Sequence, residues 1–590
     1  MHLQWQKIRR VIIGMFAAIG CIAVLFLVVG AIALARLETA RPAKPASIIL
    51  TLDLDREIVE QPSSSPFRFA IHEESVPLLD ILQAIDLART DPNVKGLIAR
   101  FGSSQPGFAH AEEIHAAILR FRESGKPTYA FGTSYGEFGN GNRAYFMASA
   151  FEHIWLQPVG SVSLTGIAIE APFARGTLDK LGVTPDFMQR EEYKSFVETF
   201  TRESFSEPAR ANMQSMIDNI ADLTAEGIAA GRKWEPARVR QLMARGPFTA
   251  DEALKHGLVT QVGYIDALEG EVIHNAGGDT VKVDADDYLS FGGRSGSPKA
   301  HVALILGTGM ITDHEDGPAG MADSEVMGAD KIASAFRDAA ADDAIKAIIF
   351  RIDSPGGSPS ASETIRAALM RAQKAGKPVF VSMANVAASG GYWVAMNADN
   401  ITAQPGTLTG SIGVVAGKFV AAGLMEKIGV SWDTLSTGGN AGMWSLTKGF
   451  TPAQRERMTV FIDDTYRSFV EGVSKAREIP MEKMPSVAKG RVFTGAQAVK
   501  LGLVDQLGGY AVTLAELRKK LELAPDDVVE VQIFPAPLTP AEKVLRILKG
   551  IGLEGAMLRS SLAELRGVMA ALRPLWRDVH MYGTPGVKAF

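Results

Sequence analysis

The sequence of this chain contains an internal repeat. VKGLIARFG at 94–102 resembles IKAIIFRID at 345–353, and GKPTYAF at 125–131 resembles GKPVFVS at 376–382. Both pairs are separated by 251 residues, as their positions show. A repeat of this length at a constant spacing indicates two related structural units, so the fold must be built twice.

The repeat extends to the later part of each unit. FTADEALKHGLVTQVG at 248–263 matches FTGAQAVKLGLVDQLG at 493–508, now 245 residues apart. The stretch FGGRSGSPKA at 291–300 is rich in Gly, Ser and Pro and is typical of a linker. We therefore predict a first copy at 47–290 and a second copy at 301–530.

Each copy alternates between strand and helix patterns. In the second copy, AIKAIIFRI at 344–352 is a nearly continuous apolar run rich in β-branched residues, which predicts a buried strand. SASETIRAALMRAQKAG at 360–376 has Ser or Thr caps and a Gly stop, which predict a helix, and KPVFVSM at 377–383 predicts the next strand. Repeated β–α units predict an α/β fold with largely parallel strands.

Composition excludes several classes of protein. With 590 residues the chain is too long for one core, and 46% hydrophobic and 22% charged residues are ordinary for globular domains. A net charge of −5 gives no reason to expect nucleic acid as a partner. The single cysteine, Cys21, allows no intrachain disulfide and no Cys-based metal site. We expect no metal and no cofactor.

Residues 11–35 form an uncharged apolar run that is long enough to cross a bilayer. The basic residues that precede it are Lys7, Arg9 and Arg10. By the positive-inside rule, residues 1–10 are expected in the cytoplasm and the rest of the chain beyond the membrane. Two processing alternatives compete with an uncleaved anchor: a signal-peptidase site at ALA 33–35, and a lipoprotein-like box at AIGC 18–21.

The two copies differ in a glycine loop. Gly356 and Gly357 of DSPGGSPSASE align with Gln105 and Pro106 of the first copy. Proline has no backbone N–H to donate, and glycine allows the backbone to approach a ligand closely. Only the second copy therefore has the Gly-Gly loop.

Two further exchanges run in opposite directions. Ser389 aligns with Asn142, so only the second copy has the serine. Lys194 aligns with Ala441, so only the first copy has the lysine. Complementary losses suggest one composite site with a part from each copy. The alternatives are coincidental drift, and a Ser389 that only caps the helix expected to start at Tyr392.

These residue types suit a serine hydrolase. A serine hydroxyl needs a base to take its proton, and a lysine can be that base when burial keeps it neutral. The developing oxyanion needs backbone N–H donors, which Gly356, Gly357 and Gly390 are candidates to supply. Gly390 also lies at a helix start, where the dipole favours negative charge.

Four strings in the same order resemble the S49 family of serine peptidases, in its long, duplicated, membrane-anchored form. They are YKSFVETF at 193–200, DSPGGSPSASE at 353–363, VAASGGYW at 386–393 and TLTGSIG at 407–413. The resemblance implies that Ser389 is the nucleophile, that Lys194 is the general base, and that Ser411 hydrogen-bonds and orients the lysine. It also implies tandem domains similar to the Clp-protease/crotonase spiral of ββα units.

The resemblance implies a substrate and a setting as well. The expected substrates are signal peptides left in the membrane after cleavage, and the expected assembly is a homotetramer. The catalytic domains would face the periplasm from an inner-membrane anchor, which contacts lipid. Glu191 and Phe196 depart from the family's small residues near the lysine. A carboxylate at Glu191 works against a low lysine pKa, and Phe196 narrows a specificity pocket.

Two other functions stay open at this stage. One is an inactive peptide-binding membrane scaffold, and the other is a crotonase-like acyl-CoA enzyme with the same spiral fold. The segment HAEEIH at 110–115 lacks metal-ligand spacing and is expected to be a solvated helix face. The C-terminal tail at 536–590 has helical periodicity and basic residues, and it is expected to pack on a subunit or lie on the membrane.

Overall fold

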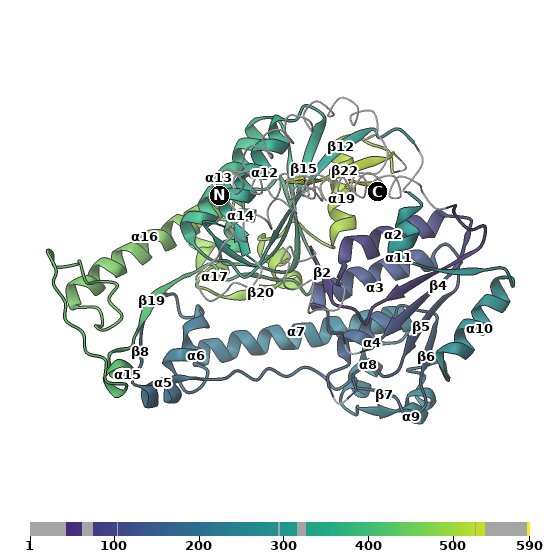
Figure 1. Ribbon diagram of the computed structural model, residues 1–590, viewed down its shortest axis with the longest axis horizontal. Coiled ribbons are helices and arrows are strands. Elements are labelled where there is room, and N and C mark those ends of the chain that lie inside the picture. The colour runs from purple at the N-terminus through teal and green to yellow at the C-terminus, as the bar shows by residue number, and fades with distance from the viewer. Residues whose placement is uncertain are drawn as a thin grey trace, which may run out of the picture.

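The computed structural model is a mixed α/β protein (Figure 1). It describes residues 43–61, 75–102, 104–137, 139–292, 296–314, 326–525 and 527–536, and the backbone of 587–589. The expected anchor at 11–35 and almost all of the tail at 536–590 lie outside the described residues. Among the helices that are described, none combines the length and the apolar character that crossing a bilayer requires.

The first copy is built on a six-stranded sheet in the order β10-β6-β5-β4-β1-β11. Every neighbouring pair in this sheet is parallel. Its strands are β1 Ile48–Asp53, β4 Val94–Phe101, β5 Thr128–Gly132, β6 His153–Leu156, β10 Gln261–Val262 and β11 Val281–Asp284.

The second copy is built on a nine-stranded sheet whose main path is β20-β18-β16-β15-β12-β22-β23; off this path, β17 pairs with β16 and β21 pairs with β17. Its pairs are parallel except β18 with β20 and β22 with β23. The strands are β12 Ala300–Thr308, β15 Ile345–Ser354, β16 Val379–Ala388, β17 Asn400–Ala403, β18 Leu408–Gly410, β20 Val492–Thr494, β21 Gln506–Leu507, β22 Val529–Phe534 and β23 Val587–Ala589.

Helices cover these sheets at equivalent places in the two copies. Helix α13, Pro359–Lys374, begins where Ser358 accepts a hydrogen bond from Ala361 N and carries proline in its first turn, which fixes its start. Its counterpart α3, Phe108–Arg122, begins 251 residues earlier. The short helices α4, Asn142–Ala148, and α14, Gly390–Ala395, follow the third strand of each copy.

The remaining elements complete the two copies. They are β2 Ile58–Val59, β3 Val76–Pro77, β7 Ser161–Val162, β9 Phe248–Thr249, β13 Met310–Thr312, β14 Val326–Gly328, α2 Leu78–Thr90, α5 Arg175–Leu181, α6 Glu198–Thr201, α8 Pro236–Met243, α9 Ala250–Lys255, α10 Ile265–Ala276, α11 Ala285–Ser290, α12 Ala329–Ala341, α15 Ala422–Lys427, α17 Met484–Val487, α18 Gly495–Ala498 and α19 Tyr510–Lys520, with 3-10 turns at Ser195–Val197, Met481–Lys483 and Val499–Leu501.

Each copy extends an arm made of a strand and a long helix. The first-copy arm holds β8, Thr184–Arg190, and α7, Glu207–Arg232; it runs beneath the second copy (Figure 1). There β8 pairs antiparallel with β19, Val414–Val420, of the second-copy arm. The second-copy helix α16, Pro452–Ala476, projects from the edge of the molecule. The arm of the first copy is thus what brings residues of both copies together.

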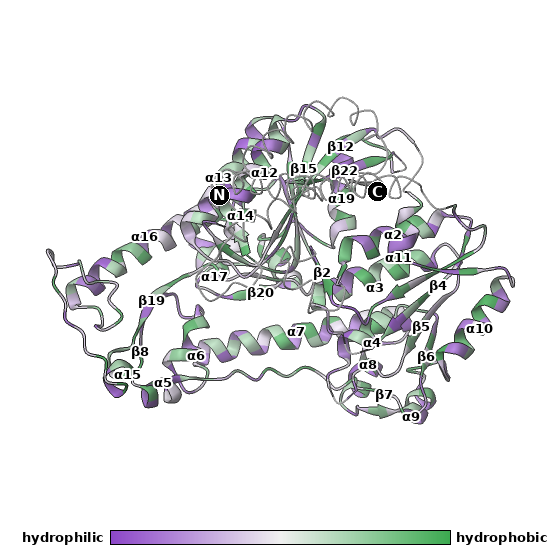
Figure 2. Ribbon diagram, viewed as in Figure 1, coloured by the Kyte–Doolittle hydropathy of each residue, from purple (hydrophilic) through white to green (hydrophobic). Residues whose placement is uncertain are grey.

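One hydrophobic core runs through both copies. Side chains of α2 and α3 pack in the same buried cluster as side chains of β12, β15 and α19. Figure 2 shows the central strands of both sheets as mostly hydrophobic along their length. The copies are therefore joined through their cores and not only through a linker.

The expectation of a solvated face for HAEEIH is wrong. His110, Glu112, Glu113 and His115 are all buried on α3. The first three contact the second copy, whereas His115 packs on Phe146 within the first copy. Arg351, fully buried in β15, forms ion pairs of 2.6 Å with Glu113 and with Glu60 of the first copy. Compensation by a buried guanidinium explains why charged side chains lie in this interface.

Candidate active site

Ser389 sits at the turn between β16 and α14. Its φ of 56° and ψ of −119° are unusual for a residue other than glycine. Its backbone N–H donates to Gly410 O at 2.9 Å, which ties the turn to β18. Its side chain makes no capping hydrogen bond to α14. Capping therefore does not account for the serine at this position.

Lys194 reaches the second copy because β8 pairs with β19. Just beyond β8, Tyr193 N donates to Lys489 O at 3.1 Å, which fixes the loop on the second copy. A Cβ added to Gly490 would lie 2.5 Å from Lys194 N, so only glycine permits this approach. The result is a distance of 2.9 Å between Lys194 Nζ and Ser389 Oγ.

The surroundings of Lys194 favour the neutral amine. Its side chain is 7% exposed, and burial lowers its pKa to about 7. Nζ also donates to Ser411 O at 2.8 Å and approaches Ser411 Oγ at 2.9 Å. Burial is the cause of this lowered pKa, while the charge of Glu191 raises the pKa values of Tyr466 and Lys489.

The three glycines pack tightly around Ser389. A Cβ on Gly356, whose φ is 103°, would lie 2.6 Å from Gly390 N and 2.9 Å from Ser389 Cβ. The Gly356 amide itself donates to Ser354 Oγ at 3.1 Å. A Cβ on Gly390 would lie 3.0 Å from Gly357 N, so the amides of Gly357 and Gly390 are close neighbours beside the serine.

In the first copy, the residue equivalent to Ser389 is engaged in hydrogen bonds to the backbone. Asn142 is buried and accepts a hydrogen bond from Thr165 N at 3.1 Å through Oδ1, while its Nδ2 donates to Gly166 O. The counterpart of the lysine, Ala441, is exposed. Asparagine has thus become a structural link where the second copy has its serine.

An aromatic wall stands beside the lysine and draws on both copies. Phe196, two residues after Lys194, is 70% exposed. Its ring lies 6.3 Å from Phe200, and Phe200 lies 5.3 Å from Phe419 of β19. Phe419 in turn contacts Phe187 of β8 edge-to-face. The wall offers an apolar surface that starts two residues after Lys194 and runs along the paired strands β8 and β19.

One trio among the described residues has potential metal ligands close together: Glu60, His110 and Asp353, whose ligand atoms lie within 4.8 Å. Both oxygens of Glu60 already accept hydrogen bonds from the Arg351 guanidinium at 2.6 to 3.0 Å. The guanidinium supplies the positive charge that a cation would bring, so the trio is better described as part of an ion-pair network.

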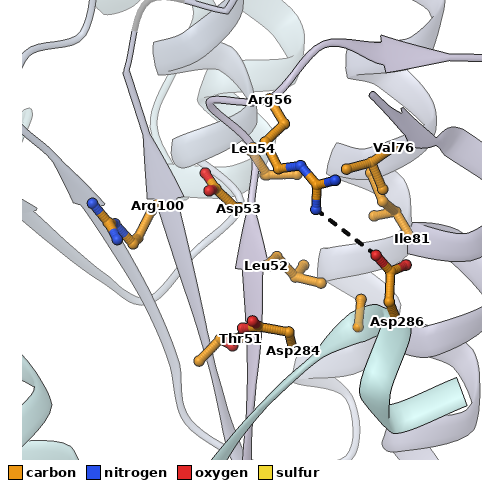
Figure 3. A pocket seen from close by; sticks show the side chains of 11 residues that line it. Thr51, Leu52, Asp53, Leu54, Arg56, Val76, Ile81, Arg100, Asp284 and Asp286 are labelled. Carbon is orange, nitrogen blue, oxygen red and sulfur yellow. Dashed lines mark hydrogen bonds and ion pairs between the residues drawn. The ribbon is translucent and has the colours of Figure 1, made fainter. Parts of the chain in front are cut away.

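A cavity of about 160 Å³ lies in the first copy, at the ends of β1 and β4 (Figure 3). It is lined by charges of both signs, and Arg56 and Asp286 pair across it at 3.8 Å. None of the residues around Ser389 contributes to its wall. The cavity is therefore separate from the serine site.

Comparison with known proteins identifies relatives of the chain. The family model described as "Peptidase family S49" matches residues 120–276 and 371–524, one segment in each copy. "Protease 4" of Salmonella typhi is 34% identical over 82% of this chain and 79% of its own length. "Protease 4" of Haemophilus influenzae is 34% identical over 75% and 73%. "Serine protease SPPA, chloroplastic" of Arabidopsis thaliana is 29% identical over 90% and 79%.

Proposed function

Because this chain belongs to peptidase family S49 and is a serine protease of that family, we propose that it is an endopeptidase that uses a Ser389–Lys194 dyad. The observation that carries the proposal is the contact of 2.9 Å between Lys194 Nζ and Ser389 Oγ. The lowered pKa of the lysine supports it, because the amine must be neutral to accept a proton.

The proposed reaction starts with proton transfer. Neutral Lys194 takes the hydroxyl proton of Ser389 as Oγ attacks the scissile carbonyl carbon. The carbonyl oxygen becomes an oxyanion, which accepts hydrogen bonds from the amides of Gly357 and Gly390. Gly356, whose amide is engaged by Ser354, would serve to let the backbone approach the serine.

The remaining steps of the reaction regenerate the free enzyme. Protonated Lys194 gives its proton to the leaving amine as the C–N bond breaks, which leaves an acyl ester on Ser389. Water then attacks the ester while Lys194 again accepts a proton, and the proton passes back to Ser389 Oγ as the acid product leaves. Ser411 holds Nζ in place through two acceptors, its carbonyl and its hydroxyl.

The proposed substrates are extended apolar peptides, and remnant signal peptides in particular. The aromatic wall of Phe196, Phe200 and Phe419 supports an apolar substrate, since aromatic side chains present large hydrophobic surfaces. The proposed location is the cytoplasmic membrane, with residues 11–35 as an uncleaved anchor and the catalytic domains in the periplasm. The intact mass of membrane-extracted protein tests the anchor, and a mature chain that starts near Arg36 contradicts it.

A serine-reactive phosphonate tests the proposed chemistry directly. Only an activated serine reacts, so wild-type protein should be labelled at Ser389, and Ser389→Ala should not be labelled. A peptide-binding scaffold or an acyl-CoA enzyme would leave Ser389 unlabelled. Mass mapping of the adduct decides between these functions.

Replacement of Ser411 should weaken the enzyme without abolishing it. Ser411→Ala removes one of the two acceptors on Lys194 Nζ and keeps the carbonyl at 2.8 Å. A lost hydrogen bond of this kind costs about 1 kcal/mol, so kcat should fall roughly fivefold to tenfold. The measurement is kcat on a fluorogenic peptide beside Ser389→Ala; equal and complete loss in two folded variants would assign Ser411 a larger role.

We also propose that the chain forms a head-to-tail homo-oligomer, a tetramer by the family resemblance. The contacts between the two copies within one chain provide the template for contacts between chains. On the first-copy helix α7, Met216 is 6% exposed and the neighbouring Asn212 bonds to Val492 of the second copy at 2.8 Å. The counterpart of Met216 on α16 is Phe461, which is 57% exposed. The second-copy arm thus presents an apolar surface whose first-copy equivalent is covered.

The first copy shows the complementary surface. Gly406 and Gly509 of the second copy lie against Phe108 and Glu113 of α3. Their counterparts in the first copy, Val159 and Tyr264, are both exposed. In an oligomer, a neighbouring chain would cover them if it docked through the corresponding face and arm of its own second copy. Such contacts are heterologous, and they form a ring when the rotation between neighbouring chains closes.

The mass of the full chain in mild detergent checks this assembly. Wild type should have the mass of several chains by light scattering, and Phe461→Glu should lower it toward one chain, because a charge would then be buried in the contact. Met481→Glu is the control, since Met481 is similarly exposed but outside these counterpart positions. A wild-type monomer, or an unaffected Phe461→Glu oligomer, would contradict the proposed interface.

A further inference from the structure

Strand β16 carries a bulge just before Ser389. Its pairing with β15 shifts register, so that Asp353 of β15 stands opposite residues 384–386 of β16. Bulges of this kind bend a strand and re-aim the residues that follow. Ser389 comes three residues after the bulge, so the bulge sets where the serine emerges from the sheet.

The carboxylate of Asp353 accepts two hydrogen bonds from the bulge. Oδ1 accepts the backbone N–H of Val386 at 2.9 Å, and Oδ2 accepts Asn385 Nδ2 at 2.9 Å. Asp353 is partly buried, with Gly356 three residues further along its own chain. One side chain therefore links the strand that leads to the serine with the strand that leads to the glycine loop.

The first copy clamps the same bulge from the other side. Asn385 Oδ1 accepts the backbone N–H of His110 at 3.3 Å, and Asn385 Nδ2 lies 2.9 Å from His110 Nε2. A Cβ on Gly107 would lie 1.9 Å from Asn385 Oδ1, so the start of α3 fits this amide only with glycine there. His110 in turn lies 2.8 Å from Glu60. The bulge is thus held between two elements of different copies.

We propose that Asp353 and Asn385 are positioning residues of the serine site: their hydrogen bond fixes the bulge that places Ser389 Oγ relative to the amide of Gly357. Neither side chain touches the reacting atoms; both act through the backbone of β16. The proposal rests on the proposed peptidase function. A displacement of the nucleophile by about 1 Å can cost up to roughly 100-fold in rate.

An exchange of the two side chains tests this role. Asp353→Asn places one amide NH₂ against another and should lower kcat by roughly 10-fold to 100-fold, with KM near wild type because no substrate contact changes. In the double variant Asp353→Asn/Asn385→Asp, the hydrogen-bond donor and acceptor trade places. The side-chain amide oxygen at position 353 still accepts the backbone N–H of Val386. We expect the double variant to recover to within about fivefold of wild type.

Asp399→Asn is the matched control. Asp399 Oδ2 accepts Val379 N at 2.8 Å and Gln373 Nε2 at 2.9 Å, so it makes the same kind of link at the start of β16, far from Ser389 in the strand. This variant should change the Tm and leave kcat within about twofold. Circular dichroism confirms the fold of every variant.

Phosphonate labelling of Ser389 provides a readout that needs no peptide. Asp353→Asn should be labelled more slowly than wild type by the same factor as kcat, and the exchange should restore the rate. Wild-type kcat in folded Asp353→Asn, or a folded double variant as slow as the single one, would overturn the positioning role alone. A wild-type protein that is not labelled at Ser389 would overturn the proposed peptidase function, and this inference with it.

Discussion

Lys194→Ala and Lys194→Arg are each expected to lower kcat/KM for peptide cleavage by roughly 10⁴-fold or more, while the protein stays folded. Removal of one member of a nucleophile–base unit costs rates of this order. Alanine removes the base, and Ser389 then has no group to accept its proton. Arginine keeps a cation in place but cannot give up its proton at working pH, so it should be as inactive as alanine.

The measurement is kcat/KM on a fluorogenic peptide for wild type, Lys194→Ala, Lys194→Arg and Ser389→Ala. Lys418→Arg is the matched control, because Lys418 on β19 is also a buried lysine, and its Nζ donates to Met443 O at 2.7 Å. We expect that control to retain activity within a few-fold. A folded Lys194→Arg enzyme with activity near wild type would exclude lysine as the base.

Activity should also depend steeply on pH below neutrality. Burial lowers the pKa of Lys194 to about 7, and the neutral amine is the reactive form. The neutral fraction is nearly complete above this pKa and falls tenfold per pH unit below it. kcat/KM should therefore drop about 100-fold from pH 8 to pH 5 and level off above pH 8.

Two rates measured on the same protein check the assignment of this titration. The rate of phosphonate labelling at Ser389 should follow the same curve as kcat/KM, because both reactions need the same proton transfer. Far-ultraviolet circular dichroism at each pH shows whether the fold persists. A labelling rate that is flat from pH 6 to pH 8, or that still rises tenfold per unit above pH 9, would show that a group other than Lys194 is titrating.

That the candidate site draws on both copies could be predicted from the sequence, because the two copies can be aligned with each other. Aligning the copies showed which one lacked the serine and which one lacked the lysine, at Asn142 and Ala441. No single-copy pattern around Ser389 distinguishes a nucleophile from a helix cap. The contact with Lys194 at 2.9 Å places the two residues of the proposed dyad together, over a separation of 195 positions.

Other parts of the site could not be predicted from local pattern. The apolar run of β16 ends at Met383, so the sequence predicted a strand that stops there, whereas the strand continues to Ala388. It can continue because Asp353 and His110 satisfy polar Asn385, and those partners come from distant parts of the chain. Gly490 was also missed, since its requirement comes from the Lys194 backbone it faces.

The error over HAEEIH has the same origin. Polar residues on an amphipathic helix usually face water, and the pattern alone predicted that outcome for α3. Burial here depends on Arg351, a fully buried residue of the apolar strand β15, whose guanidinium pairs with Glu60 and Glu113. Burial also raises the pKa of Glu112 to about 8. Such compensation across copies leaves no periodic signal in either segment.

The division of the site between the two copies has a consequence for protein synthesis. The ribosome makes Lys194 first and reaches Ser389 only 195 residues later, a delay of roughly 10 to 40 s at ordinary elongation rates. Even then the base cannot meet the serine until β8 has paired with β19. A nascent chain that ends before residue 389 therefore holds only Lys194 of the proposed dyad and cannot assemble the proposed site.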